Sequence, residues 1–482
     1  MLFNSLTYLL LLTAVFVGYW LLPLRGRLSL IFVASLTFYA FWKIEFLPVM
    51  MVSVMIDYWV ALAMRDRSPV AKKLLLVLSL AVNLGLLFYF KYLIFFAENA
   101  VGIANLVGIQ MDPFVLDIIL PLGISFYTFQ TLSYTIDVYR GVLKPERDFL
   151  VYGCFVTFFP QLVAGPILRA SEVIPQLVRR PTFSLTGVFI GVRRIIFGLF
   201  LKVVLADNIA PLVDAGFSLP TDSLSALDVW TLAFLFGFQI YFDFSAYSSI
   251  AIGSARILGI QFPENFNFPY LANSPREFWR RWHISLSSWI RDYLYLPLSG
   301  IQVQYKSEGG LMQATNAKQK NFALFMTWAV MGLWHGANWT FVLWGIYLAA
   351  IIFAYRLLSP YLSSFGNNFC YFGGILVTLP LMMLSWIPFR AESVSSTLMM
   401  CRQIFIPDSY LVLGMRENTY LVAAIVMVGI VATYFVKNTI APWLEKNHRG
   451  ILCTAESAIF AVTIPLVLVF LRPISQFIYF QF

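Results

Sequence analysis

Long runs of apolar residues, separated by short polar connections, make up most of the chain. A helix that crosses a bilayer needs about 20 consecutive, mostly apolar residues. Several runs reach that length and others are short or interrupted, so the pattern predicts about ten to twelve membrane crossings. The runs lie near residues 5–24, 28–42, 44–64, 74–97, 114–139, 186–206, 227–251, 321–335, 340–358, 371–389, 419–437 and 453–471. We therefore expect an all-α polytopic membrane protein.

Two stretches differ from simple membrane spans. Residues 155–181 begin apolar but are broken by proline and glycine. Non-helical backbone at membrane depth survives only where protein or a water-filled cavity surrounds it, so we expect this stretch to re-enter the membrane without crossing it. Residues 261–300 mix Trp, Arg, Pro and His and are too polar to face lipid. We expect them to form interfacial helices that cap a cavity.

The composition supports a membrane protein. Of the 482 residues, 60% are hydrophobic and 12% are charged, whereas soluble domains contain about 25% charged residues. The net charge of +9 does not indicate a nucleic-acid ligand, because the basic residues are spread over short connections, as in cytoplasmic loops. With Arg25, Arg27 and the basic loop 65–73 on the cytoplasmic side, the N-terminus is expected outside.

No sequence motif indicates a metal, a disulfide framework or a nucleotide-phosphate loop. Walker-type, GxGxxG, HExxH and GxSxG patterns are absent. The four cysteines show no CxxC spacing, and they are Cys154, Cys370, Cys401 and Cys453. We therefore expect no metal site, and a reaction that a general base, an oriented donor and desolvation can carry.

One histidine falls at the junction of two apolar runs. It is His335, in MGLWHGANWTFVLWGIY, beside Trp334. Ionisable groups at membrane depth are costly and usually mark function. A low dielectric constant favours the neutral imidazole, the form that accepts a proton from a hydroxyl group. If the stretch is helical, Asn338 shares the face of His335, and Gly332 and Gly336 allow another backbone or a ligand to come close. The alternative is a histidine that only hydrogen-bonds between packed helices.

A second histidine, His283, lies in SPREFWRRWHISLSSWIRDYLYLPL. Ser274, Pro275 and Glu277 predict a capping box and a helix that begins at Ser274, with an N-terminus that favours anions. Nearby basic residues would hold the phosphates of a nucleotide-bearing thioester, and they are Arg276, Arg280, Arg281 and Arg291. The alternative is that these arginines bind lipid headgroups.

A buried acid forms the third feature. Gln239 and Asp243 lie one helical turn apart within the run 227–251. Asp243 either pairs with a buried cation, for example Arg256 or Arg281, or lines a polar cavity. Pairing is the favoured interpretation, because histidine is better suited to general-base work near neutral pH.

Four blocks of the sequence resemble the membrane-bound O-acyltransferases, in particular their bacterial branch of alginate O-acetylation. The blocks stand in family order and are FFPQLVAGPILRASEVIPQL, QIYFDFSAYSSIAIG, FNFPYLANSPREFWRRWHISLSSWIRDYLYLPLSG and GLWHGANWTFVLWG. The resemblance extends to the C-terminal FIYFQF.

The resemblance implies one catalytic membrane domain over residues 1–482, with helices in a ring around a central funnel. Its N-terminal helices would fall in 1–140, its catalytic core in 141–350 and its C-terminal helices in 351–482. The catalytic histidine then corresponds to His335 and a second characteristic histidine to His283. The expected supporting residues are Asp243, Gln239, Asn338, Trp334 and Arg281, and the expected donor-binding residues are Arg276, Arg280 and Arg291.

The resemblance also implies a reaction. The expected enzyme sits in the bacterial cytoplasmic membrane, holds no bound cofactor and takes an acetyl group from acetyl-CoA. An exported partner related to serine esterases (SGNH type) would complete transfer to a polysaccharide. The alternatives are O-acetylation of peptidoglycan, D-alanyl transfer to teichoic acid, and a transporter, which would usually show internal repeats. The FIYFQF tail would form an interfacial aromatic belt, dock the partner or approach the funnel mouth.

Overall fold

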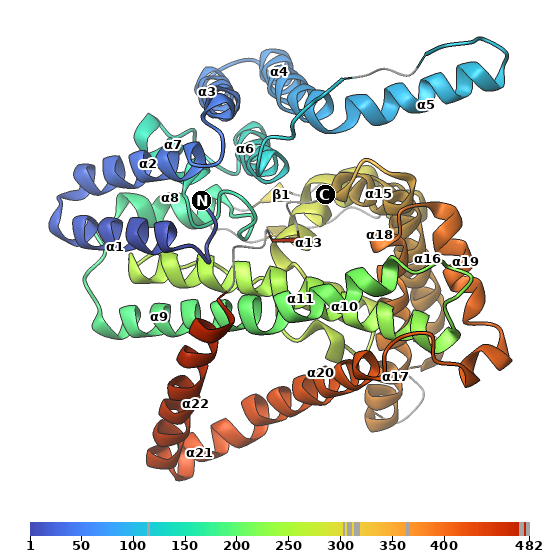
Figure 1. The fold of residues 1–482 in the computed structure, drawn as a ribbon. Helices are drawn as coiled ribbons and strands as arrows, with labels where there is room; N and C mark the ends of the chain where they lie inside the picture. The colour runs from blue at the N-terminus through green and yellow to red at the C-terminus, as the bar shows by residue number, and fades with distance from the viewer. Residues whose placement is uncertain are drawn as a thin grey trace.

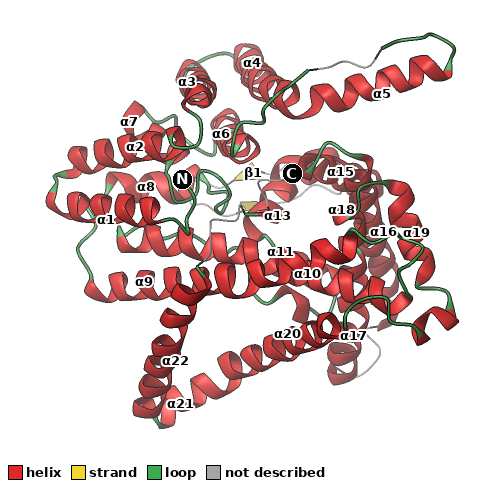
Figure 2. Ribbon diagram, viewed as in Figure 1, coloured by secondary structure: helices red, strands yellow, loops and turns green. Residues whose placement is uncertain are grey.

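The computed structural model describes residues 1–112, 116–301, 304–305, 311–312, 319–362, 367–471 and 477–478. Most of these residues are helical (Figures 1 and 2). The described strands are β1 (Gln304–Tyr305) and β2 (Leu311–Met312), which pair antiparallel with Gln304 opposite Met312. The expected all-α class is confirmed.

The N-terminal part begins with two helices that lie side by side, and one later helix projects from the body as an arm (Figure 1). The elements are α1 (Leu6–Leu21), α2 (Leu24–Ala40), η1 (Ile44–Phe46), α3 (Leu47–Ala63), α4 (Pro69–Leu87), the π-helical turn η2 (Phe88–Tyr92), the projecting α5 (Leu93–Leu106) and α6 (Ile124–Tyr139).

The middle of the chain contains the long central helix and a series of short ones. The elements are α7 (Phe149–Thr157), α8 (Ala170–Val178), α9 (Leu185–Leu199), the π-helical turn η3 (Phe200–Ala206), α10 (Asp207–Phe217), α11 (Ala226–Ile257), η4 (Pro269–Leu271), α12 (Pro275–Arg281), α13 (Ile284–Ile290), the π-helical turn η5 (Arg291–Tyr295) and α14 (Leu296–Leu298).

The C-terminal part supplies the helix that ends at His335, and its last long helices form a V on one side of the body (Figure 1). The elements are α15 (Lys320–His335), α16 (Trp339–Leu362), α17 (Asn367–Leu384), α18 (Trp386–Arg390), α19 (Val394–Gln403), η6 (Pro407–Leu411), α20 (Glu417–Phe435), the π-helical turn η7 (Val436–Ile440), α21 (Ala441–Asn447) and α22 (Arg449–Phe470).

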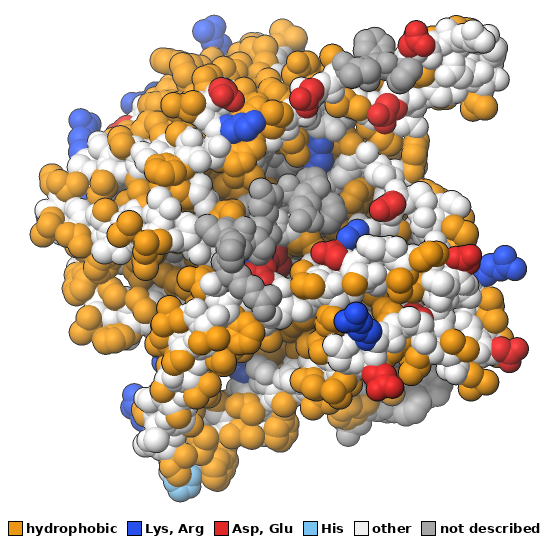
Figure 3. All heavy atoms as spheres, viewed as in Figure 1, with side chains coloured by type: hydrophobic (Ala, Val, Ile, Leu, Met, Phe, Trp, Pro, Cys, Tyr) orange, Lys and Arg blue, Asp and Glu red, His pale blue; other side chains and the backbone are white. Residues whose placement is uncertain are grey.

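Seven helical stretches of the described chain are long and apolar enough to cross a membrane. They are Ile44–Ala63, Pro69–Leu106, Ala226–Ile257, Trp339–Tyr361, Tyr371–Arg390, Glu417–Asn447 and Arg449–Phe470. The other predicted runs form shorter helices, such as α1 and α15. Only 6% of the apolar window of α22 is buried, against 83% for α11, and apolar side chains are spread over the visible face (Figure 3). The outer helices thus present apolar surface to lipid, and α11 lies in the protein interior.

Helix α11 is the centre of the fold. It begins with a capping box in which Ser225 and Asp228 each accept a backbone N–H of the other. Along its length α11 packs against α9 with very close backbones: a Cβ atom on Gly191 would stand 2.7 Å from the carbonyl oxygen of Gly253. Small residues at such crossings let helices approach closely in membranes.

A buried ion pair ties α11 to η3. Lys202 Nζ lies 2.7 Å from Asp243 Oδ1 and 2.8 Å from Asp207 Oδ1, and the Lys202 and Asp243 side chains are 2% and 3% exposed. The pairing of Asp243 with a buried cation is confirmed, but the cation is neither Arg256 nor Arg281. Arg256 and Arg281 were named as examples of such a cation, and the packing of η3 against α11 brings Lys202 to the acid instead.

The start of the C-terminal tail lies beside this ion pair. The backbone N–H of Ile478 donates to Asp243 Oδ2 at 2.6 Å, and Lys202 Nζ stands 4.5 Å from the centre of the Phe477 ring. Tyr247, one turn along α11, contacts Phe477 on one side and Phe3 on the other, with ring centres 5.1 and 4.3 Å away. Both tail residues are buried, which does not fit an interfacial belt at these two positions. Residues 479–482 lie outside the described chain.

The broken stretch 155–181 has the expected non-helical core. Helix α7 ends at Thr157, and residues 158–168 turn without a helix while every one of them is buried. The amides of Gln130 and Gln161 both donate to the Phe155 carbonyl, at 2.6 and 2.7 Å. Protein groups therefore satisfy a backbone acceptor that lipid would leave without a partner.

Helices α15 and α16 contact each other through glycine. A Cβ atom on Gly332 would collide with the carbonyl of Phe341, and a Cβ atom on Gly345 with the carbonyl of Trp328. The close backbone approach expected at Gly332 is confirmed, and its partner is α16.

We predict that Gly345→Ala destabilises the protein by about 1–3 kcal/mol, because the methyl group forces two helix backbones apart. The measurement is the thermal unfolding midpoint of the purified protein in detergent. The control is Gly429→Ala in α20, where an added Cβ meets no atom within 4 Å. Equal midpoints for the two variants would contradict the backbone contact.

We also predict that Lys202→Met destabilises the fold by about 3–5 kcal/mol, because it leaves Asp243 buried without its cation. Combining it with Asp243→Asn should restore part of the loss. The exposed pair Arg193–Glu456, with 48% and 39% exposed side chains, is the control: Arg193→Met should cost less than about 1 kcal/mol. A Lys202→Met variant as stable as the control would show that the buried pair is unimportant.

Candidate active site

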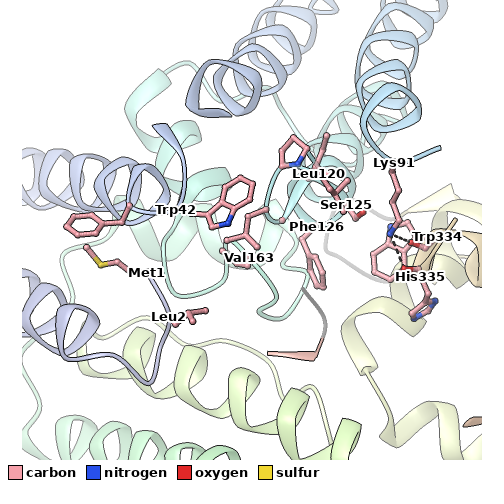
Figure 4. Close-up of a pocket in the computed structure, with 15 residues that line it drawn as sticks. Met1, Leu2, Trp42, Lys91, Leu120, Ser125, Phe126, Val163, Trp334 and His335 are labelled. Carbon is pink, nitrogen blue, oxygen red and sulfur yellow. Dashed lines mark hydrogen bonds between the residues drawn. The ribbon is translucent and has the colours of Figure 1, made fainter. Parts of the chain in front are cut away.

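A cavity of about 400 Å³ lies beside the C-terminal end of α15. Its described lining comes from the N-terminal segment, the loop after α2, the residues around the start of α6, and the Trp334–His335 pair. Lys91, Trp334 and His335 lie at one end of the cavity, and Met1, Leu2 and Trp42 at the other (Figure 4).

His335 is the last residue of α15, and its side chain is held by the helix itself. The residue is 5% exposed, and ring atom Nδ1 lies 2.7 Å from the Met331 carbonyl oxygen. A carbonyl oxygen only accepts, so Nδ1 carries the proton, and in the neutral ring Nε2 carries the lone pair. The rings of Trp344 and Phe389 stand 4.8 and 5.4 Å from the imidazole centre. His335 therefore combines a fixed ring orientation with a proton-accepting nitrogen.

Trp334 packs into an aromatic stack. Its ring lies almost parallel to Phe129 with 5.1 Å between centres, and Phe129 in turn stacks on Trp289 at 3.9 Å. Phe126 contacts the other side of this group, 5.7 Å from Trp334. The indole forms a rigid wall of the cavity.

The prediction that Asn338 shares a helical face with His335 is wrong. The helix ends at His335 because Gly336 is extended, with φ −161° and ψ 148°. Asn338 instead accepts the Thr340 backbone N–H through Oδ1 at 3.0 Å, just before α16 begins. Its contact with His335 was inferred from helical spacing that the chain does not keep.

His283 is completely buried and lies in a strained backbone position. Its φ of 40° and ψ of 55° are left-handed, a conformation that costs free energy for a residue other than glycine. Nδ1 lies 3.2 Å from Asn265 Oδ1, which also accepts the Ser285 backbone N–H. The described lining of the cavity does not include His283. Phe126 connects the two regions, since it lines the cavity and stacks on His283 at 6.4 Å.

The predicted donor-binding arginines lie away from this cavity's described lining. Arg276, Arg280 and Arg291 are exposed. Arg291 Nε binds Asp292 Oδ1 at 2.7 Å, and Arg280 is 3.8 Å from Glu277. All three are therefore surface cations, and Arg280 and Arg291 have local acidic partners.

Helix α12 begins as predicted, but half of its capping box is wrong. Ser274 caps the helix by accepting the Glu277 backbone N–H. The Glu277 carboxylate does not return to Ser274, because it pairs with Arg281 Nε at 2.9 Å. Arg281 is thus committed to an ion pair within its own helix.

Gln239 and Asp243 share a buried face of α11, as predicted. Neither is in the described lining of the cavity. Asp243 belongs to the Lys202 ion pair, and Gln239 Oε1 has no hydrogen-bond partner among the described residues.

Sequence reasoning missed Lys91. Its Nζ donates to the carbonyl oxygens of Trp334 and His335, at 2.6 and 3.0 Å (Figure 4). A signal was present: Lys91 is a single cation inside the apolar run 74–97, and charged residues at membrane depth usually mark function. Lys202 is likewise a cation inside an apolar run, 186–206, although that run also contains Arg193 and Arg194.

Comparison with known proteins identifies the family. The chain is similar to the probable alginate O-acetylase of Azotobacter vinelandii, 39% identical over 82% of this chain and 76% of the relative. It is similar to the peptidoglycan O-acetyltransferase of Helicobacter pylori, 37% identical over 80% and 75%. It is also similar to the teichoic acid D-alanyltransferase of Bacillus subtilis, 29% identical over 50% and 60%.

The model of the membrane-bound O-acyltransferase family matches residues 29–379. That match includes α15, both buried histidines and the whole of α11. The long apolar helices of the described chain agree with this match, because they indicate a protein that crosses the bilayer several times. This chain therefore belongs to the membrane-bound O-acyltransferase family, and it is an acyltransferase.

Proposed function

We propose that this enzyme O-acetylates an exported or cell-envelope polysaccharide from the bacterial cytoplasmic membrane, with acetyl-CoA as donor. His335 acts as the general base. The observation that carries the proposal is the orientation of this imidazole: the Met331 carbonyl holds Nδ1 in its protonated form beside a cavity, so Nε2 accepts the proton.

The acetyl-transfer step on this chain involves the chain, the donor and an acceptor hydroxyl, before the exported partner completes transfer to the polysaccharide. Nε2 of His335 takes the proton of the acceptor hydroxyl while the hydroxyl oxygen bonds to the thioester carbonyl carbon. The carbon–sulfur bond then breaks, and the CoA thiolate leaves and takes the proton back from the imidazole. His335 is only 5% exposed, and limited access of water would protect the thioester from hydrolysis.

The other predicted residues have separate roles in this proposal. His283, fixed by Asn265 and stacked on Phe126, orients the cavity wall. Arg276, Arg280 and Arg291 attract the phosphates of the donor from the surface, and Trp334 shapes the cavity. Asp243, Gln239 and Arg281 support the fold around the site.

The names of the relatives support a glycan acceptor. Alginate O-acetylation fits the similarity to the A. vinelandii relative. We further propose that an exported serine-esterase-like partner completes the transfer. The H. pylori relative keeps peptidoglycan as a second candidate acceptor.

We predict that His335→Gln lowers kcat for acetyl transfer by about 100- to 10,000-fold, the range expected for loss of a general base. The measurement is transfer of radiolabel from acetyl-CoA into the polysaccharide fraction of membrane vesicles. The control is His448→Gln, which removes an exposed histidine at the end of α21 and should leave the rate unchanged. A His335→Gln variant with wild-type turnover would exclude the proposed base.

The identity of the donor has its own test. Vesicles that contain the enzyme should incorporate label from acetyl-CoA and not from a D-alanyl carrier-protein thioester. Incorporation from the D-alanyl thioester alone would assign the chain to teichoic acid modification.

A further inference from the structure

The backbone carbonyl groups at the C-terminal end of α15 need hydrogen-bond donors from outside the helix. The last carbonyl groups of a helix have no N–H partners within it, and helix ends fray. Many helices satisfy these carbonyl groups by placing a residue in the left-handed conformation after the helix, so that the chain folds back over the last turn. Here the chain leaves in an extended conformation at Gly336. The proposed general base is therefore the terminal residue of a helix that lacks this common cap.

Lys91 supplies the missing donors. Its ammonium group bonds both the Trp334 and the His335 carbonyl oxygens and stands 5.9 Å from the centre of the Trp334 ring. A cation at a helix C-terminus also interacts favourably with the helix dipole. Among the described residues Lys91 forms no ion pair. Its positive charge is instead stabilised by the two backbone carbonyl groups to which it donates.

The position of Lys91 depends on a local irregularity. Four π-helical turns interrupt the described helices and each contains one basic residue: Lys91 in η2, Lys202 in η3, Arg291 in η5 and Lys437 in η7. A π-helical turn inserts a residue into the helix, and such turns are frequent at functional sites. In η2 it occurs between α4 and α5, where the side chain of Lys91 reaches across to α15 (Figure 4).

We propose that Lys91 is the positioning residue for His335. Two hydrogen bonds hold His335. Its imidazole Nδ1 donates to the Met331 carbonyl oxygen, and its own backbone carbonyl accepts from Lys91. With both fixed, Nε2 keeps one direction relative to the cavity. This inference rests on the proposed role of His335 as the base, and it assigns Lys91 a role in turnover rather than in substrate binding.

The test compares Lys91→Met and Lys91→Arg in the full-length chain. Methionine keeps the length of the side chain but has neither hydrogen-bond donors nor a positive charge. Arginine keeps the donors and the charge. We expect Lys91→Met to lower kcat by about 10- to 100-fold, as for loss of hydrogen bonds from a charged group, with the KM for acetyl-CoA unchanged. Lys91→Arg should recover most of the rate. The assay is radiolabel transfer from acetyl-CoA in membrane vesicles.

The matched control is Lys437→Met. Lys437 also lies in a π-helical turn, η7, and its cation stands 5.1 Å from the centre of the Phe268 ring, which is not part of α15. The Lys437→Met substitution should leave kcat unchanged. If Lys91→Met does not accumulate as folded protein, Lys91→Gln, a neutral donor, replaces it, with an expected rate between those of the wild type and His335→Gln.

Three results would overturn the inference: a wild-type kcat for Lys91→Met or Lys91→Gln, an effect confined to KM, or an equal loss in Lys437→Met. A wild-type rate for His335→Gln, measured beside them, would instead reject the proposed function. The two failures are therefore distinguishable.

Discussion

The constraint on which this structure depends is that a polar group at membrane depth is costly unless it finds a partner within the protein. Water is absent there, and an unsatisfied backbone group costs several kcal/mol. Glutamine amides meet the Phe155 carbonyl where α7 ends, and Lys202 meets the Asp243 carboxylate at the centre of the fold. Lys91 meets the last carbonyls of α15. The irregular segments of this enzyme are thus the places where such partners are provided.

The same constraint explains why the candidate base can sit at a helix end. A residue in the middle of α15 would be held on both sides by helical hydrogen bonds, but the described lining of the cavity takes only Trp334 and His335 from this helix. At position 335 the helix stops and the cavity begins. The bonds to Met331 and Lys91 then replace the rigidity that the helix no longer gives.

The elements that follow from local pattern were predictable. The apolar runs gave the helices, the broken stretch 155–181 gave a buried non-helical segment, and Ser274 with Pro275 gave the start of α12. His335 was found because a histidine among tryptophans in apolar sequence is unusual, and its neighbour Trp334 does line the cavity.

The errors concern side-chain partners that only the packing of helices decides. Arg256 and Arg281 were named as example partners of Asp243, and Asn338 was placed on the face of His335 by helical spacing. The actual partner of Asp243 comes from a helix that packs against α11 through glycines. Helix crossings and π-helical turns decide such pairings, and neither leaves a mark in the periodicity of apolar residues.

The aromatic contacts of Tyr247 have a consequence for how the molecule comes apart. Phe3 and Phe477, at opposite ends of the described chain, rest against the same ring on α11. If the segment around Phe3 or the one around Phe477 loosens, the Tyr247 ring loses a neighbour. The same ring supports the other segment, so we expect the two segments to gain and lose order together. One tyrosine side chain on α11 thus joins the first and last parts of the described chain.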